Sequence, residues 1–178
     1  MDRLIALLRA VNVGGRKLPM ADLRALCGEL GWEDVETYIQ SGNLVFKAGG
    51  EPDALETQLE KAIRAKFGMD VPVIIRTAPQ WAGYVKANPF PEAAKAEPKA
   101  LQLLVSKRPP DKDAAARLME RAQSGERVKA AGGALWFHFP EGIARSKLTP
   151  SLIDKACGSP STSRNWRTVL TLLQMAQG

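Results

Sequence analysis

The sequence has few of the residues that build disulfide frameworks, metal sites or acid–base centres. Its 178 residues include two cysteines, Cys27 and Cys157, and a single histidine, His138. Neither cysteine stands at ligand spacing from another cysteine or from the histidine, so we expect no disulfide scaffold and no metal site. Such sparse cysteine usage is typical of a reducing compartment, and we expect a cytoplasmic protein.

Long apolar runs and nucleotide-binding motifs are also missing. The first apolar run, Leu4 to Leu8, is interrupted by Arg9 and is too short for a signal-peptide core or a membrane span. The sequence contains neither the G-x-x-x-x-G-K-[ST] phosphate loop nor the G-x-G-x-x-G dinucleotide fingerprint. We therefore expect a protein that does not enter a membrane and that carries no cofactor.

Positive charge is in excess only in the second half of the chain. The net charge is +6, and residues 1–88 hold 11 Lys/Arg and 11 Asp/Glu, whereas residues 89–178 hold 14 and 8. Attraction for polyanions would therefore be centred in the second half. A solvated surface that keeps the protein soluble explains the same charges.

The hydrophobic pattern predicts an α+β protein of two ferredoxin-like units in tandem, with antiparallel sheets. Residues 1–88 read strand, helix, strand, strand, helix, strand, which is the split βαβ unit, followed by a connecting helix. The run Asn88-Pro89-Phe90-Pro91 marks the boundary, and residues 89–178 form a second, more basic unit with two C-terminal helices. The expected strands are 3–11, 34–40, 44–46, 71–77, 100–105, 127–130 and 135–139, and the expected helices are 19–30, 51–67, 78–87, 111–123, 150–156 and 164–176.

The central strands of both units are apolar on both faces. Leu4 to Leu8, Leu44 to Phe46 and Leu101 to Val105 show no alternation of apolar and polar residues. The helices of a split βαβ unit cover only one face of its sheet, and large apolar faces are seldom left in water. We expect the second face to be covered by the opposite unit, by the terminal helices or by a second copy of the chain, which would make a homodimer.

Three segments supply a specific combination of motifs. They are LRAVNVGG at residues 8–15 followed by Pro19-Met20 and Leu23, TYIQSGN at 37–43, and TSRNW at 162–166. With them the chain resembles, over nearly its full length, the bacterial family catalogued as domain of unknown function 1697. The resemblance implies two ferredoxin-like units and no established activity. Family members often have Gly where this chain has Ala10 and Thr where it has Ser163.

The loop at residues 9–19 and the turn at residues 41–43 both allow two interpretations. In the loop, Gly14 and Gly15, the cations Arg16 and Lys17 and the free amides of a helix N-terminus could hold an anion, or the segment simply connects a strand to a helix. The turn Ser41-Gly42-Asn43 fits a tight hairpin, in which Gly42 takes a positive φ and Asn43 tolerates one. Its polar side chains could instead line the rim of a sheet, with Tyr38 as an aromatic platform.

The segment before the last expected helix gives a third candidate. Its hydroxyl residues fit N-caps, and Trp166 falls on one apolar stripe with Val169, Leu170 and Leu173, which indicates a core position. A cation in the first helical turn opposes the helix dipole, so Arg164 needs a buried carboxylate or a bound anion as its partner. The candidate ligand-binding residues are Asn12, Gly14, Gly15, Lys17, Tyr38, Gln40, Ser41, Asn43, Arg145, Lys147, Thr162, Arg164 and Asn165.

These observations predict a binding module for an anionic small molecule or for nucleic acid. The central strands lack the aromatic signature of an RRM, so any nucleic acid would be held electrostatically, with strong salt dependence. The alternative is an enzyme that acts on a small phosphorylated or carboxylated metabolite in the cleft between the two units. Catalytic residues stay unassigned, because His138 lies in an aromatic strand, where packed histidines are common, and Cys157 has no visible partner.

Overall fold

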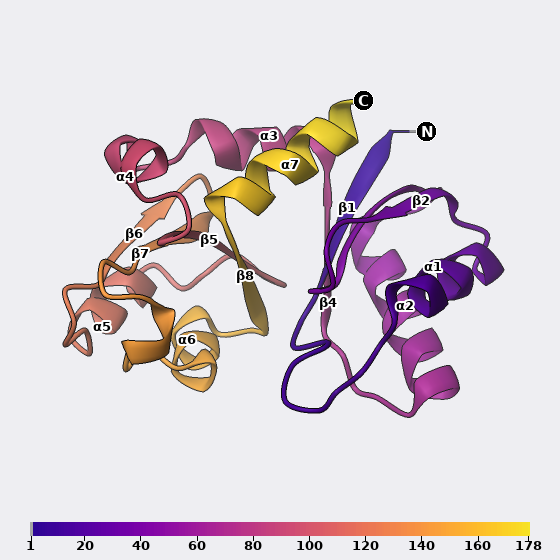
Figure 1. Ribbon diagram of the computed structural model, residues 1–178, viewed down its shortest axis with the longest axis horizontal. Helices are drawn as coiled ribbons and strands as arrows, with labels where there is room; N and C mark the ends of the chain where they lie inside the picture. The colour runs from indigo at the N-terminus through magenta and orange to yellow at the C-terminus, as the bar shows by residue number, and fades with distance from the viewer. Residues whose placement is uncertain (1) are drawn as a thin grey trace. The chain divides into compact units, whose positions relative to one another are not determined.

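The chain forms two ferredoxin-like units in tandem, each with its own antiparallel sheet (Figure 1). The computed structural model describes residues 2–178. By its internal contacts the chain divides into a first unit, which holds the residues up to Trp81 together with Leu172–Gly178, and a second unit, which holds Ala82–Thr171. This architecture is the one that the hydrophobic pattern predicts. None of the described helices combines the length and hydropathy that crossing a bilayer requires.

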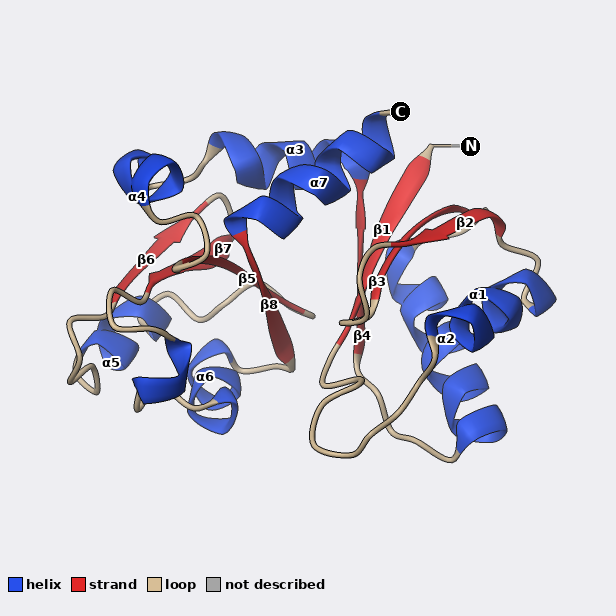
Figure 2. Ribbon diagram, viewed as in Figure 1, coloured by secondary structure: helices blue, strands red, loops and turns tan. Residues whose placement is uncertain are grey.

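In the first unit, two helices cover one face of a four-stranded sheet (Figure 2). Alternate residues of β1 (Leu4, Ala6 and Leu8) pack against these helices, which are amphipathic. In spatial order the strands are β2 (Glu33–Thr37), β3 (Asn43–Lys47), β1 (Arg3–Leu8) and β4 (Val73–Thr77), and the helices are α1 (Met20–Glu29) and α2 (Pro52–Phe67).

Carboxylates from α2 close the outer edge of this sheet. Because β4 is an edge strand, alternate amides of β4 point away from β1 and need another acceptor. Glu60 accepts a hydrogen bond from Val73 N at 3.0 Å, and the buried Glu56 accepts one from Ile75 N at 2.9 Å. Arg76 Nη1 lies 3.6 Å from Glu56 Oε1, and this ion pair offsets the negative charge of Glu56. These two edge amides are therefore not available as donors to a further strand.

The second unit repeats the topology of the first. Its sheet buries Leu104, Leu135 and Phe137 against two helices on one face. The strands in spatial order are β6 (Arg127–Ala131), β7 (Ala134–His138), β5 (Leu101–Ser106) and β8 (Ser161–Asn165), and the helices on this face are α5 (Ala114–Met119) and α6 (Pro150–Cys157). The other helical segments are α3 (Ala78–Lys86), α4 (Pro91–Ala96), the 3₁₀ turn η1 (Ile143–Arg145) and α7 (Trp166–Gln177).

The opposite face of this second sheet lies beneath α4 and the first turns of α7 (Figure 2). Trp136 of β7 meets Trp166 at the start of α7, with ring centroids 5.8 Å apart. The turn between β6 and β7 approaches the end of α3 so closely that a Cβ on Gly132 would stand 2.7 Å from Ala87 Cβ. This second layer of helices positions the pocket described below.

Both faces of the central strands are buried within the single chain. Ile5 and Leu7 point away from α1 and α2, yet they are only 0% and 2% exposed, and Leu103 in the second unit is 1% exposed. The end of α7 belongs to the first unit, where Arg3 Nη1 donates to the carbonyl oxygen of Met175 at 3.3 Å. The apolar faces are therefore covered, as the sequence requires, and their burial does not need a second copy.

The prediction of a helix over residues 164–176 is wrong at its start, because residues 161–165 form strand β8 beside β5. The polar sequence STSRN gives no strand periodicity, and the backbone partners on β5 decide its conformation. The helix begins at Trp166, and its buried apolar positions are Val169, Leu172 and Ala176, while Leu170 is 41% exposed.

Other bounds also differ from the predictions. The strand expected at 34–40 is β2, Glu33–Thr37, and the strand expected at 71–77 is β4, Val73–Thr77. The first strand ends at Leu8 rather than Val11, because Ala10 turns the chain with φ at +56°. The helix expected at 111–123 is only α5, Ala114–Met119. The chain after the Pro89-Phe90-Pro91 break resumes as the short helix α4, which the sequence did not indicate.

Candidate ligand-binding site

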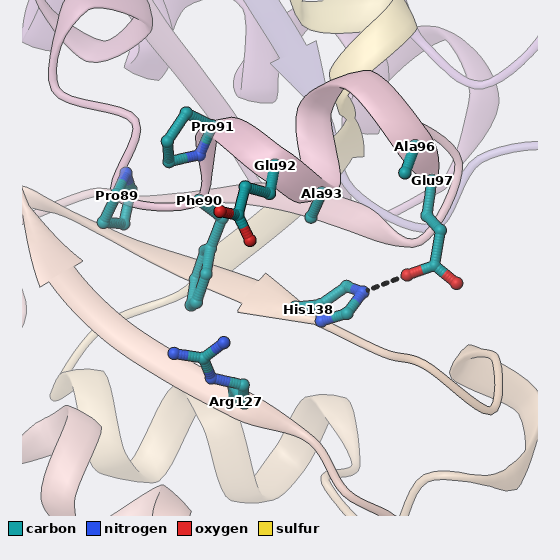
Figure 3. Close-up of a pocket in the computed structure, with 9 residues that line it drawn as sticks. All are labelled: Pro89, Phe90, Pro91, Glu92, Ala93, Ala96, Glu97, Arg127 and His138. Carbon is teal, nitrogen blue, oxygen red and sulfur yellow. Dashed lines mark hydrogen bonds and ion pairs between the residues drawn. The ribbon is translucent and has the colours of Figure 1, made fainter.

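A pocket of about 470 Å³ lies inside the second unit, between the α4 segment and the outer part of the sheet (Figure 3). One wall consists of residues from 89 to 97, and the other wall carries Arg127 of β6 and His138 of β7. The volume is in the range of small-molecule sites, roughly 300–1,000 Å³.

Prolines fix both ends of the α4 wall. Asn88 Oδ1 accepts a hydrogen bond from Phe90 N at 2.9 Å, and Pro91 then begins the helix with its φ already suited to a first turn. The helix ends before Pro98, which disfavours helical backbone at the residue preceding it, Glu97. The same short segment therefore presents Phe90 at one end and Glu97 at the other.

On the sheet wall, Arg127 and His138 face each other across the β6–β7 hairpin. Direct cross-strand partners project from the same face of a sheet, so both side chains point toward α4. Lys129 follows on the same face, two residues along β6. The buried Phe90 ring lies under both cations, 5.2 Å from Arg127 Cζ and 4.9 Å from Lys129 Nζ, which is cation–π geometry.

A hydrogen bond joins the two walls at the far end of the pocket. His138 Nε2 donates to Glu97 Oε2 at 2.7 Å, and the side chains are 15% and 49% exposed. The carboxylate therefore fixes the tautomer and orientation of the imidazole, since Nε2 carries the shared proton. Figure 3 shows this bond bridging α4 and β7.

The sequence-predicted residues of the first unit lie in the loops that flank the ends of β1, β2 and β3, except Asn43, which begins β3. Asn12 uses its side chain as a clamp: Nδ2 donates to the carbonyl oxygens of Leu18 at 2.9 Å and Gln40 at 2.6 Å, and Oδ1 accepts from Leu18 N at 2.9 Å. Gly14, Gly15 and Lys17 are exposed beyond this clamp. The structure thus brings the two loops together and gives Asn12 a structural task.

The turn Ser41-Gly42-Asn43 also has a structural explanation. Asn43 lies in β3, fully buried, and its Nδ2 donates to Tyr38 O at 3.1 Å and to Ser41 Oγ at 3.0 Å. The positive φ values fall on Gly42, at +80°, and on Ile39, not on Asn43. A Cβ at Gly42 would stand 2.7 Å from Leu8 Cβ and 2.7 Å from Val11 Cγ2, so glycine is required by packing.

The predicted residues of the second unit lie on different sides of its sheet. Arg145 and Lys147 are exposed beside Leu148, which belongs to the core under α5 and α6. Arg164 pairs with Leu103 in the register of β5 and β8 and so points to the opposite face. Asn165 Oδ1 accepts from Thr168 N at 3.0 Å at the start of α7.

Arg164 is a buried cation in a strand, so its placement in a helical first turn was wrong. Its Nη1 donates to Thr162 Oγ1 and to Ser163 O, both at 2.8 Å, and the residue is 9% exposed. Burial lowers the pKa of the guanidinium to about 10. The helix-dipole argument for an anion at Arg164 no longer applies, because Arg164 lies in strand β8, which has no helix dipole.

Neither cysteine offers nucleophilic chemistry. Burial raises the pKa of the Cys27 thiol to about 12 and that of Cys157 to about 11, and both side chains are at most 1% exposed. Within residues 2–178, no three His, Cys, Asp or Glu side chains cluster as metal ligands would. The chemistry of the pocket therefore depends on its guanidinium, imidazole and carboxylates.

Sequence reasoning missed the residues that line this pocket, although one signal was present. The two-residue turn Gly132-Gly133 fixes the hairpin register and places Arg127 opposite His138. The partner Glu97 gave no signal, because only the tertiary position of α4 brings it to the imidazole.

Fold and site together define a tandem ferredoxin-like α+β protein with a small pocket, lined by both apolar and charged residues, in its second unit. The chain belongs to the family of proteins of unknown function DUF1697, whose model matches residues 1–136. The chain is also similar to the solved structure of the conserved bacterial protein SP0830 from Streptococcus pneumoniae. That similarity has a TM-score of 0.73 and 22% sequence identity, covering 100% of this chain and 99% of the other. A search of curated proteins finds no match.

Proposed function

We propose that this protein binds a small molecule with a carboxylate or phosphate group in the pocket beneath α4. The observation that carries the proposal is Arg127, an exposed guanidinium on the pocket wall whose charge has no ion-pair partner among residues 2–178. A guanidinium presents paired N–H donors that match a carboxylate or phosphate. The aromatic ring of Phe90 beneath it limits its motion, which preorganises the contact.

The form of the site favours a small molecule over nucleic acid. Single-stranded nucleic acid is held by exposed aromatic side chains on which bases stack. In the central strand β7, Trp136 and Phe137 are 0% and 1% exposed and are unavailable for stacking. The surplus of basic residues in the second half supports an anionic ligand without indicating a polymer. The experiment below must therefore distinguish binding of a small anionic molecule from binding of nucleic acid.

An enzyme acting on the same molecule is the second candidate, and the His138–Glu97 pair favours it. An imidazole oriented by a carboxylate, in a pocket of ligand size, is an arrangement suited to general acid–base catalysis. If this candidate is correct, His138→Gln should abolish conversion of a bound compound while the compound still binds. If conversion by His138→Gln equals that of the native protein, this role is excluded.

Location and assembly are part of the same proposal. Two free, buried cysteines support a cytoplasmic location. The apolar strands are buried within one chain and no longer require a homodimer, which stays an untested prediction that sedimentation velocity at micromolar concentration would test.

The binding proposal is tested by thermal unfolding with a panel of carboxylated and phosphorylated metabolites. A ligand at 100 times its Kd should stabilise the protein by about 2.7 kcal/mol, or roughly 5–10 °C in Tm. We expect Arg127→Met to lose this shift and Arg121→Met, which removes an equal charge outside the pocket, to keep it. An undiminished shift in Arg127→Met would contradict the proposal. The proposal would also be contradicted if no metabolite of the panel binds and the protein binds only nucleic acid, with an affinity that falls as salt is added.

A further inference from the structure

We propose that the ligand of this pocket is a zwitterion, a small amino acid whose carboxylate meets Arg127 and whose ammonium group meets Glu92. This inference rests on the proposed function and deepens it. It follows from the distribution of charge over the two walls, because α4 contributes carboxylates and the sheet contributes cations.

Glu92 is the first part of this argument. Its carboxylate lines the pocket from the first turn of α4, is exposed, and makes no hydrogen bond or ion pair with any of residues 2–178. Figure 3 shows the carboxylate turned from α4 toward the space bounded by Phe90 and His138. The second carboxylate, Glu97, is already occupied by His138 at 2.7 Å. Only Glu92 is left to receive a cation.

Arg127 is the matching group on the other wall. Figure 3 places its guanidinium across the pocket from Glu92, beyond the Phe90 ring. The two charges do not form an ion pair with each other, although they line the same cavity. A ligand that carries both a carboxylate and an ammonium group would pair both charges at once.

A simple anion fits the site less well than a zwitterion. An anion seated against Arg127 would desolvate Glu92 without giving it a partner, and unpaired carboxylates are costly to bury. Prolines, alanines and Phe90 form the rest of the α4 wall, so an uncharged side chain suits the remaining space. The chemical class is therefore an α-amino acid with a neutral side chain.

The experiment is isothermal titration calorimetry of the full chain with each of the 20 proteinogenic L-amino acids. The tightest binder is then compared with its N-acetyl form, which lacks the ammonium, and with its amide, which lacks the carboxylate. We expect each derivative to bind at least 10-fold more weakly. Glu92→Gln should weaken the free amino acid about 10-fold and leave the N-acetyl form unchanged, whereas the matched control Glu120→Gln, outside the pocket, should change neither.

Two results would overturn the inference. One excludes only the zwitterion, and the other also excludes the proposed function. If the N-acetyl form binds as tightly as the free amino acid and Glu92→Gln has no effect, the zwitterion is excluded and anion binding at Arg127 stands. If no amino acid, N-acetyl amino acid, inorganic phosphate or metabolite of the thermal panel binds, the zwitterion and the proposed function fail together.

Discussion

Replacing Gly42 with alanine should destabilise the first unit much more than the same change at Gly31. The two glycines have nearly the same backbone conformation, with φ at +80° and +83°. They differ in surroundings, because a Cβ at Gly42 would stand 2.7 Å from Leu8 Cβ and from Val11 Cγ2, while a Cβ at Gly31 would have nothing within 4 Å. The pair of variants therefore separates the cost of backbone strain from the cost of overlap.

The expected magnitudes follow from these two contributions. An L-residue in the left-handed region costs roughly 1–2 kcal/mol, and both variants carry this cost. Overpacking a closed site costs about 1–3 kcal/mol more. Only Gly42→Ala carries this second cost, because Leu8 Cβ cannot move without its strand and Val11 is 2% exposed. We expect a loss of about 1–2 kcal/mol for Gly31→Ala and about 2–5 kcal/mol for Gly42→Ala.

Urea unfolding followed by circular dichroism measures both losses. Amide exchange at Leu8, whose N–H donates to Gly42 O at 2.8 Å, reports the local effect. Equal destabilisation by the two substitutions would refute the packing explanation of the Ser41-Gly42-Asn43 turn. The turn would then return as a candidate ligand rim.

Three further predictions concern stability and thiol reactivity. Ala10→Gly should raise the free energy of unfolding by about 0.5–1 kcal/mol in urea, because φ is +56° there, and a loss of stability would contradict this. Cys27 and Cys157 should not react with Ellman's reagent at pH 8 until the protein unfolds, since burial raises both pKa values, and rapid labelling of native protein would count against it. Burial opposes ionisation of Glu126, but hydrogen bonds from its own backbone, a serine hydroxyl and neighbouring amides outweigh it and lower its pKa. Its contribution to stability is therefore full above its ordinary pKa and is lost as the pH falls, so Glu126→Gln should flatten the acid side of the stability profile; an unchanged profile would exclude this.

Local signals predicted most of the fold. Thr149 caps α6 by accepting from Leu152 N at 3.3 Å, and Gly68 and Gly158 end their helices in the left-handed conformation. These features depend on residues close in sequence, and a single sequence contains them. Strand β8 could not be predicted in the same way, because its polar residues become a strand only through pairing with β5.

The candidate site depends more on tertiary structure than the fold does. The register of the Gly132-Gly133 hairpin could have placed Arg127 beside His138 from the sequence. The position of α4, and with it Glu97, follows from packing across the sheet face and leaves no periodic signal. The motif residues that stand out in the sequence, such as Asn12, instead form hydrogen bonds within the loops.

The most direct test of a binding site beneath α4 is the ¹H NMR spectrum of the His138 imidazole during titration with the tightest-binding compound. His138 is the only histidine in the sequence, so a protein without a purification tag gives a single, unambiguous set of imidazole resonances. We predict a saturable shift of these resonances in the native protein and none in Arg127→Met at the same concentrations. Binding detected by calorimetry while the His138 resonances stay in place would put the ligand elsewhere and contradict the site.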